Sequence, residues 1–175
     1  ATPAGREFGY QLTFFRRALA PSPDRRPSAW STNQMYMAHF ALTDMDDGAH
    51  EGHERLARGA AGLAGADAEP FRVWVDDWRA ESTGSDMFPM RLVARAGDVA
   101  VDLTLTDAKP IVQHGRDGFS VKTRDGGAAS YYYSFTRVNT EGAVVVGGRR
   151  HAVAGASWID REWSTSVLDT RHTGW

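Results

Sequence analysis

Apolar and polar side chains alternate with a period of two residues along most of this chain. The alternation is clearest at residues 8–14, 71–78 and 99–106, where large apolar side chains recur at every second position. Successive side chains of a β-strand point to opposite faces of the sheet, so each of these segments can bury one face and expose the other. We therefore predict a chain built mainly from antiparallel strands.

Turn-forming sequences separate the predicted strands at short intervals. Ala-Gly-Asp at residues 96–98 predicts a hairpin between the strand through Met90 and Leu92 and the strand that follows. Further turn signals lie at residues 115–118, 125–127 and 139–142, and they separate predicted strands at 119–124, 130–138 and 143–153. Short strands at this spacing are typical of an antiparallel barrel or sandwich.

Two segments interrupt this pattern. Residues 20–31 contain three prolines, which lack the backbone N–H that a central strand needs, so a surface loop is predicted there. Residues 50–64 place Leu56, Ala60 and Leu63 at helical spacing and predict one short amphipathic helix, weakened by two glycines. The predicted fold class is all-β, an antiparallel barrel or sandwich with one short helix.

The composition limits the classes of function. A length of 175 residues suits one domain with a substantial core, and a net charge of −2 from 20 basic and 22 acidic residues gives no electrostatic case for nucleic acid as a partner. The chain has no cysteine, which excludes disulfides and a thiolate nucleophile. It has no apolar run of about 18 residues and no signal peptide at its start. Because it also begins without methionine, we expect a piece of a longer protein with both ends incomplete.

Three motifs that suggest a metal or phosphate are better explained as ordinary structure. The histidines of the segment 50–54 are three positions apart, whereas a zinc-protease helix needs four. The acids of the segment 44–48 lack the ligand order of a calcium loop, so a plain turn is predicted. Gly147 and Gly148 lie within a strand pattern and predict a bulge or bend. No metal or cofactor is expected.

The segment 155–164 is the strongest candidate for a functional site. Alternation directs Trp158, Asp160 and Glu162 to one side of a strand, and it directs Ile159, Arg161 and Trp163 to the other. Apolar surroundings raise the pKa of a carboxyl group, which keeps an acid usable near neutral pH. Asp160 and Glu162 are therefore candidate acids. The alternative is a satisfied network in which they pair with Arg137, Arg149 or Arg161.

Four runs of sequence together resemble the carotenoid 1,2-hydratase and AttH-like family. They lie at residues 8–16, 38–44, 131–137 and 155–164, with Arg55 and the segment 113–118 also in the expected places. The resemblance covers nearly the whole chain in order. It implies a lipocalin-like domain that forms the first half of a two-domain protein, with a second lipocalin-like domain of the same protein as its partner.

The resemblance implies three alternative functions. The first is binding of an apolar lipid or isoprenoid in a barrel. The second is acid-assisted hydration or cyclisation of an isoprenoid or polyene, a hydro-lyase type of reaction in which Asp160 or Glu162 donates the proton. The third is an accessory role in an ABC transport complex. Secreted or periplasmic localisation is implied, with peripheral association to a membrane or transporter.

Aromatic and polar side chains supply the candidate ligand contacts. Trp158, Trp163, Tyr131 and Tyr133 can present π faces to a ligand or to a carbocation, although strand tyrosines also commonly fill cores. Gln11 and His39 lie on predicted strands with apolar neighbours, where each is expected as a buried polar group with a partner or as a ligand contact. At position 161 this chain has Arg where hydratase-like members more often have His, and Arg cannot act as an acid or base.

Overall fold

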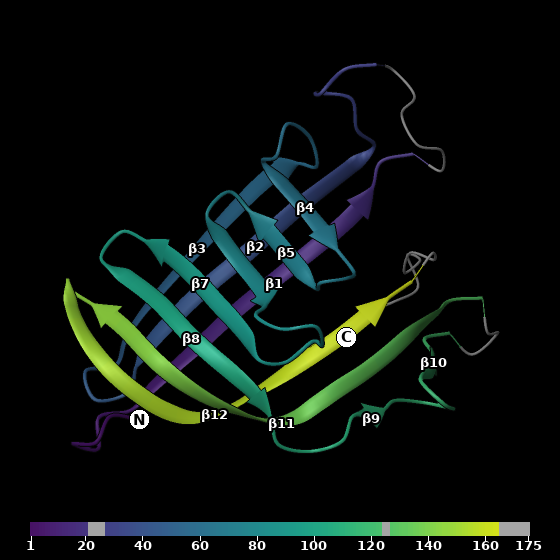
Figure 1. The fold of residues 1–175 in the computed structure, drawn as a ribbon. Helices are drawn as coiled ribbons and strands as arrows, with labels where there is room; N and C mark the ends of the chain where they lie inside the picture. The colour runs from purple at the N-terminus through teal and green to yellow at the C-terminus, as the bar shows by residue number, and fades with distance from the viewer. Residues whose placement is uncertain (21–26, 124–126, 165–175) are drawn as a thin grey trace. The chain divides into compact units, whose positions relative to one another are not determined.

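The computed structural model describes residues 1–20, 27–123 and 127–164, and within them the chain is all-β and antiparallel (Figure 1). These residues form no helix, and so none that is long and apolar enough to cross a membrane. The chain divides into two compact units. Among the described residues, those within 1–106 and 140–155 form the first unit, and those within 107–139 and 156–164 form the second.

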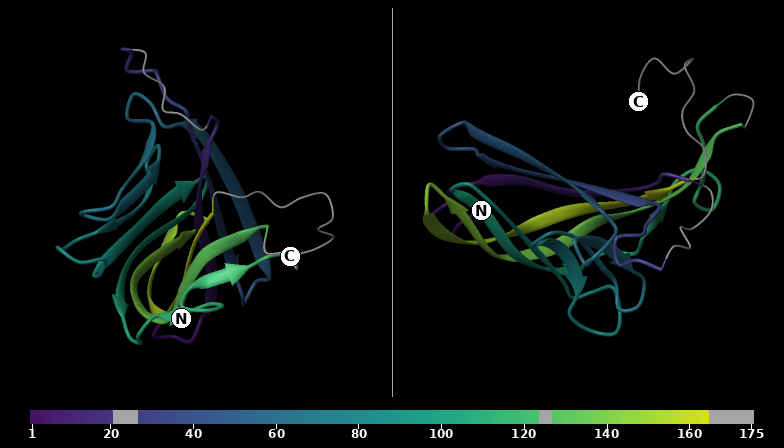
Figure 2. Two further views of the ribbon diagram at one scale, coloured as in Figure 1. Left: turned by 90° about the vertical axis from the view of Figure 1, so that its right-hand side faces the viewer. Right: turned by 90° about the horizontal axis from the view of Figure 1, so that it is seen from above.

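The first unit contains a three-stranded sheet of β1 (Phe8–Ala18), β2 (Gln34–Asp44) and β3 (Ala49–Arg58). The strands lie side by side (Figures 1 and 2). Their register is antiparallel, with Leu12 opposite Phe40 and Phe40 opposite His53. Alternate residues of β2 are buried, and Phe40 is fully enclosed with its ring edge-on to Trp78 at 5.7 Å. The alternation in residues 8–14 thus correctly predicted the first strand.

The helix predicted at residues 50–64 is wrong, because this segment forms β3 and the turn that follows it. Every residue of β3 pairs with β2, and this long-range pairing outweighs the local helical spacing. Leu56, which suggested an apolar helix face, is 65% exposed. A Cβ at Gly59 would lie 2.8 Å from the Tyr36 ring, so glycine permits the close packing where β3 ends.

The first unit also contains a row of five antiparallel strands. They are β4 (Ala64–Asp67), β5 (Arg72–Val75), β6 (Trp78–Ser82), β7 (Met90–Ala96) and β8 (Val99–Asp107), the last of which ends just beyond the unit. The hairpin predicted at residues 96–98 joins β7 to β8. Val75, Trp78, Leu103 and Leu105 are no more than 1% exposed and form much of the core.

Two long strands, β11 (Ala129–Val146) and β12 (Arg149–Trp163), contribute residues to both units. The turn predicted at residues 139–142 is wrong, because β11 continues through it. Gly142 has φ of 147° and its backbone lies so close to Asp102 that a Cβ would meet the Asp102 carbonyl oxygen at 2.2 Å. Chain reversal occurs instead at Gly147 and Gly148, both with positive φ, so these glycines form a turn between strands rather than a bulge within one.

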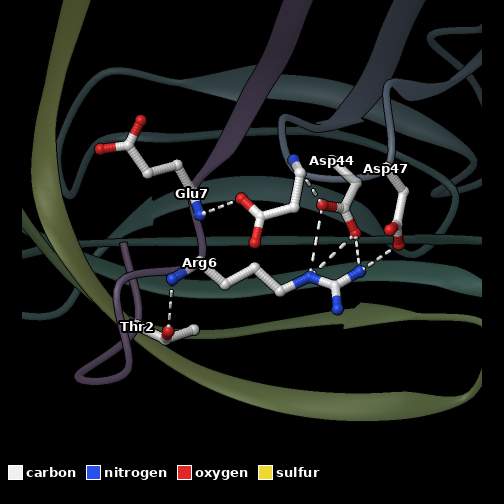
Figure 3. A network of polar contacts seen from close by, with 6 residues as sticks. Thr2, Arg6, Glu7, Asp44 and Asp47 are labelled. Atoms are coloured by element: carbon white, nitrogen blue, oxygen red, sulfur yellow. Dashed lines mark hydrogen bonds and ion pairs between the residues drawn. The ribbon is translucent and has the colours of Figure 1, made fainter.

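A buried ion pair joins the turn after β2 to the residues that precede β1 (Figure 3). The Asp44 side chain is 1% exposed, and it accepts hydrogen bonds from the Arg6 guanidinium, which also pairs with Asp47. The hydrogen bond from Arg6 holds the pKa of Asp44 below its usual value. The segment 44–48 is thus a plain turn between β2 and β3, as predicted, and it is fixed to the residues that precede β1.

The second unit is built around β9 (Val112–Gln113), β10 (Phe119–Val121) and the first part of β11. Gln113 pairs with Tyr133, and Phe119 pairs with Tyr131. The turn predicted at residues 115–118 is confirmed and connects β9 to β10. Gly115 has φ of 69°, and a Cβ there would lie 2.2 Å from the Phe119 carbonyl oxygen, so the turn requires glycine.

Parts of several predictions lie outside the described residues. These parts are residues 21–26 of the proline-rich loop and residues 125–126 of one predicted turn. The described remainder of the loop, residues 27–31, contains no strand, as predicted.

Candidate functional site

In the second unit, β11 and β12 separate polar from aromatic side chains. On β11, Ser130, Tyr132 and Ser134 alternate with Tyr131, Tyr133 and Phe135, and the contacts of the two sets differ. We define the polar face as Ser130, Tyr132, Ser134, Trp158, Asp160 and Glu162, and the aromatic face as Phe119, Tyr131, Tyr133, Phe135 and Trp163. The predicted division of segment 155–164 is thus confirmed for Asp160, Glu162 and Trp163.

The Asp160 carboxylate accepts three hydrogen bonds on one oxygen. Oδ1 accepts from the Trp158 indole at 2.7 Å, from the Tyr132 hydroxyl at 3.0 Å and from the Ser134 hydroxyl. Burial alone would raise the pKa of Asp160, but the hydrogen bonds from Ser134, Trp158 and Tyr132 outweigh it and hold the pKa below its usual value. Asp160 is therefore ionised at neutral pH.

Glu162 has a separate set of partners. Its Oε1 lies 2.7 Å from the Lys122 amino group and accepts a 2.6 Å hydrogen bond from the Ser130 hydroxyl. Burial would raise the pKa of Glu162, but Lys122 and Ser130 together lower it. The upward shift expected for the two candidate acids is thus not found. Both carboxylates lie in a hydrogen-bonded network of lysine, hydroxyl and indole donors.

His114 completes the polar face from the residue after β9. Its Nε2 lies 2.7 Å from Ser134 Oγ, and its ring stacks on Tyr132 with centroids 3.9 Å apart and planes 19° apart. Ser134 is fully buried between His114 and Asp160. Backbone hydrogen bonds from His114 N to Tyr132 O and from Tyr132 N to Gly118 O fix this loop on β11.

Sequence reasoning placed the two acids but missed the residues that contact them. These residues are His114, Lys122, Ser130, Tyr132 and Ser134. A usable signal existed for His114, which directly precedes the glycine of a recognisable turn, and for the serines, which share the alternation of the tyrosines. Lys122 follows β10 and offered no local signal.

The aromatic face is a continuous row of five rings. Phe119 meets Tyr131 edge-on at 5.7 Å, and Tyr131 stacks on Trp163 at 5.6 Å. Tyr133 meets Trp163 at 6.0 Å and Phe135 at 5.7 Å, both edge-on. Phe119, Tyr131 and Trp163 are 43%, 52% and 53% exposed, so much of the row is open to solvent.

The remaining predicted ligand contacts do not join this row. Trp158 is on the polar face. Gln11 and His39 belong to the first unit, where Gln11 is exposed and donates to the Thr13 hydroxyl at 3.1 Å. The His39 side chain is 41% exposed and meets Phe15 edge-on at 5.2 Å. The expectation that Gln11 is buried is therefore wrong, because it lies on the open face of the β1–β3 sheet.

A shallow hollow lies in each unit. That of the first unit measures about 340 Å³ and includes Tyr36, Gly59 and Trp74 in its lining. That of the second unit measures about 450 Å³ and is lined by residues 107–111 and by Phe135, the end of the aromatic row. Within the described parts of the chain, no three His, Asp or Glu side chains lie close enough to hold a metal ion.

Comparison with known proteins places the chain in a family. The family model described as AttH-like matches residues 1–175, the whole sequence. The chain belongs to the AttH-like family. The search of functionally curated proteins gave no match.

Two solved structures of similar fold extend the comparison. An AttH protein of Nitrosomonas europaea is 32% identical and superposes with a TM-score of 0.81 over 97% of this AttH-like chain and 50% of its own. Kievitone hydratase of Nectria haematococca is 14% identical, with a TM-score of 0.72 over 94% of this chain and 45% of its own. The chain thus spans about half the length of both proteins, and the second likeness concerns the fold alone.

Proposed function

We propose that this AttH-like chain binds an apolar small molecule, of the lipid or isoprenoid class, on the aromatic face of its second unit. The observation that carries the proposal is the row of five rings in mutual contact, three of them about half exposed. A soluble protein rarely exposes so much contiguous aromatic surface without a binding role. The hollow beside Phe135 extends the row and offers space at its end.

The free energy gained by covering the exposed rings is of the size expected for reversible ligand binding. Covering the exposed half of one aromatic side chain removes roughly 100 Å² from water, which is worth about 2.5 kcal/mol before ordering costs. Tyr131 and Trp163 are already stacked on each other, so a ligand orders them little further. Two such rings contribute about 5 kcal/mol before the cost of lost ligand freedom, so a ligand must cover more of the row to reach a micromolar affinity of about 8 kcal/mol.

Acid-assisted hydration is the second candidate function. The ionisation of Asp160 and Glu162 argues against direct donation of a proton by either carboxylate. Asp160 and Glu162 both have lowered pKa values and are ionised at neutral pH, whereas protonation of an alkene needs a protonated acid. Hydration on the polar face therefore requires that a neighbouring group deliver a proton to one of them.

A pair of tryptophan variants tests the binding proposal. Trp163→Ala interrupts the aromatic row, while Trp30→Ala removes a 61% exposed tryptophan of the first unit. Calorimetric titration with farnesol, a sesquiterpene alcohol, should show affinity about tenfold weaker for Trp163→Ala and unchanged for Trp30→Ala. Equal affinities of the wild type and Trp163→Ala would overturn the proposal.

A further inference from the structure

The hydrogen-bond chain on the polar face has a defined direction. Asp160 is ionised and has no proton to give, so the Ser134 hydroxyl donates its single hydrogen to Asp160 Oδ1. The oxygen of Ser134 must then accept from His114 Nε2, at 2.7 Å. Before any proton moves, His114 therefore carries a proton on Nε2.

We propose that His114 and Ser134 form a proton relay that recharges Asp160, so that the polar face is a site of proton transfer separate from the aromatic face. The donors point from His114 through Ser134 to Asp160, which is the order needed to deliver a proton to the carboxylate. Ser134 is 0% exposed, so water does not compete for its hydroxyl. This inference stands whether or not the aromatic face binds a ligand.

The transfer balances atom by atom. The imidazolium of His114 gives its Nε2 proton to Ser134 Oγ, and Ser134 gives its own hydrogen to Asp160. One N–H bond breaks at His114, one O–H bond forms at Asp160, and Ser134 remains a hydroxyl. The products are neutral imidazole with its proton on Nδ1 and a neutral carboxylic acid, which is the proton donor that an ionised Asp160 cannot be.

Neighbouring groups hold the relay in place. The Tyr132 ring stacks on His114 at 3.9 Å, and its hydroxyl donates to Asp160 at 3.0 Å, so one side chain fixes both ends. Lys122 lies 5.4 Å from the centre of the Tyr132 ring and pairs with Glu162 at 2.7 Å. The positive charge of Lys122 is thus engaged by the second carboxylate, and the remaining ionisable groups around the polar face are Asp160 and His114.

The position of His114 also bears on the arginine at 161. Hydratase-like members of the resembled family more often have His at position 161, where this chain has Arg. The structure places a histidine, His114 in the loop that follows β9, within two hydrogen bonds of Asp160. A proton-handling group is therefore present on the polar face despite Arg161.

The first test is the tautomer of His114 in the unmodified full chain. Nitrogen-15 NMR of labelled histidine, recorded on the neutral ring, should show Nε2 protonated and Nδ1 unprotonated. The opposite tautomer would overturn the proposal, because Ser134 would then have to donate to His114 and could not donate to Asp160. This measurement needs no variant and no substrate.

The second test is the coupling between the two ends of the relay. Carbon-13 NMR of the Asp160 carboxyl in the wild type should show an inflection that coincides with the change in the His114 ring signals. Ser134→Ala should reduce that inflection to the part that the His114 charge produces through space. Ser130→Ala is the matched control, since it removes an equally buried hydroxyl that serves Glu162, and it should leave the inflection unchanged. An inflection that persists undiminished in Ser134→Ala contradicts a relay through this hydroxyl.

Discussion

Ser130 and Ser134 lie four residues apart on β11, and each donates its hydroxyl to a different carboxylate of β12. Both serines are buried, at 4% and 0% exposure, and the two acids lie two residues apart on the facing strand. Side chains that are two or four positions apart on a strand point to the same face, so both serines and both acids lie on the polar face. It also means that the two carboxylates can be perturbed one at a time.

Removing the Lys122 charge should make the free energy of unfolding less dependent on pH in the acidic range. The pKa of Glu162 is lowered in the folded state, so its contribution is present above the usual glutamate pKa and is lost as the pH falls through the lowered value. We expect Lys122→Met to cost about 1 kcal/mol at pH 7 and much less at pH 3. Urea unfolding at both pH values measures the difference, and an equal loss at both would contradict an ionic origin.

Replacing Trp158 by Phe should affect the polar face alone. The variant keeps an aromatic ring and removes the N–H that donates to Asp160 at 2.7 Å, so the pKa of Asp160 should rise toward its usual value. Carbon-13 NMR titration of the carboxyl measures the change. Affinity for farnesol should stay within twofold of the wild type. A tenfold loss would instead make Trp158 a ligand contact, as its sequence position suggested.

Much of the fold could be predicted because strand alternation and turn chemistry are local properties. The hairpin at residues 96–98 and the turn at 115–118 follow from short sequences and are confirmed. The errors arise where a neighbouring strand decides the outcome. Residues 50–64 have helical spacing, yet pairing with β2 makes most of them a strand. Residues 139–142 have turn-forming composition, yet β11 continues through them.

The candidate site was predictable in part for the same reason. Alternation placed Asp160 and Glu162 on one side of a strand, but it gave no information on what faces them. The serine partners lie 32 and 26 positions earlier in the chain. Those partners reverse the expected pKa shift, because hydrogen bonds to the ionised form outweigh burial.

Gly142→Ala should destabilise the protein through backbone geometry. The residue has φ of 147°, and a Cβ would lie 2.2 Å from the Asp102 carbonyl oxygen, so β8 or β11 must shift to admit the methyl group. We expect a loss of about 2 kcal/mol or more in the free energy of unfolding. Gly9→Ala in β1 is the control, because a Cβ there makes only an ordinary 3.8 Å contact with Thr43. Equal losses in urea unfolding would show that Gly142 has no special role.

Asp44 and Asp47 both pair with Arg6, but only Asp44 is buried. Variants of the two residues therefore compare the stability contributed by a buried ion pair with that of an exposed one. The Asp44 side chain is 1% exposed and that of Asp47 is 64% exposed, and both pair with Arg6. Asp44→Asn leaves Arg6 without its buried partner, so it should lower the urea midpoint at pH 7 several times more than Asp47→Asn does. The pKa of Asp44 is lowered in the folded state, so the deficit of Asp44→Asn should shrink as the pH falls through that lowered value. Similar urea midpoints for the two variants would show that burial of Asp44 adds nothing to this contact.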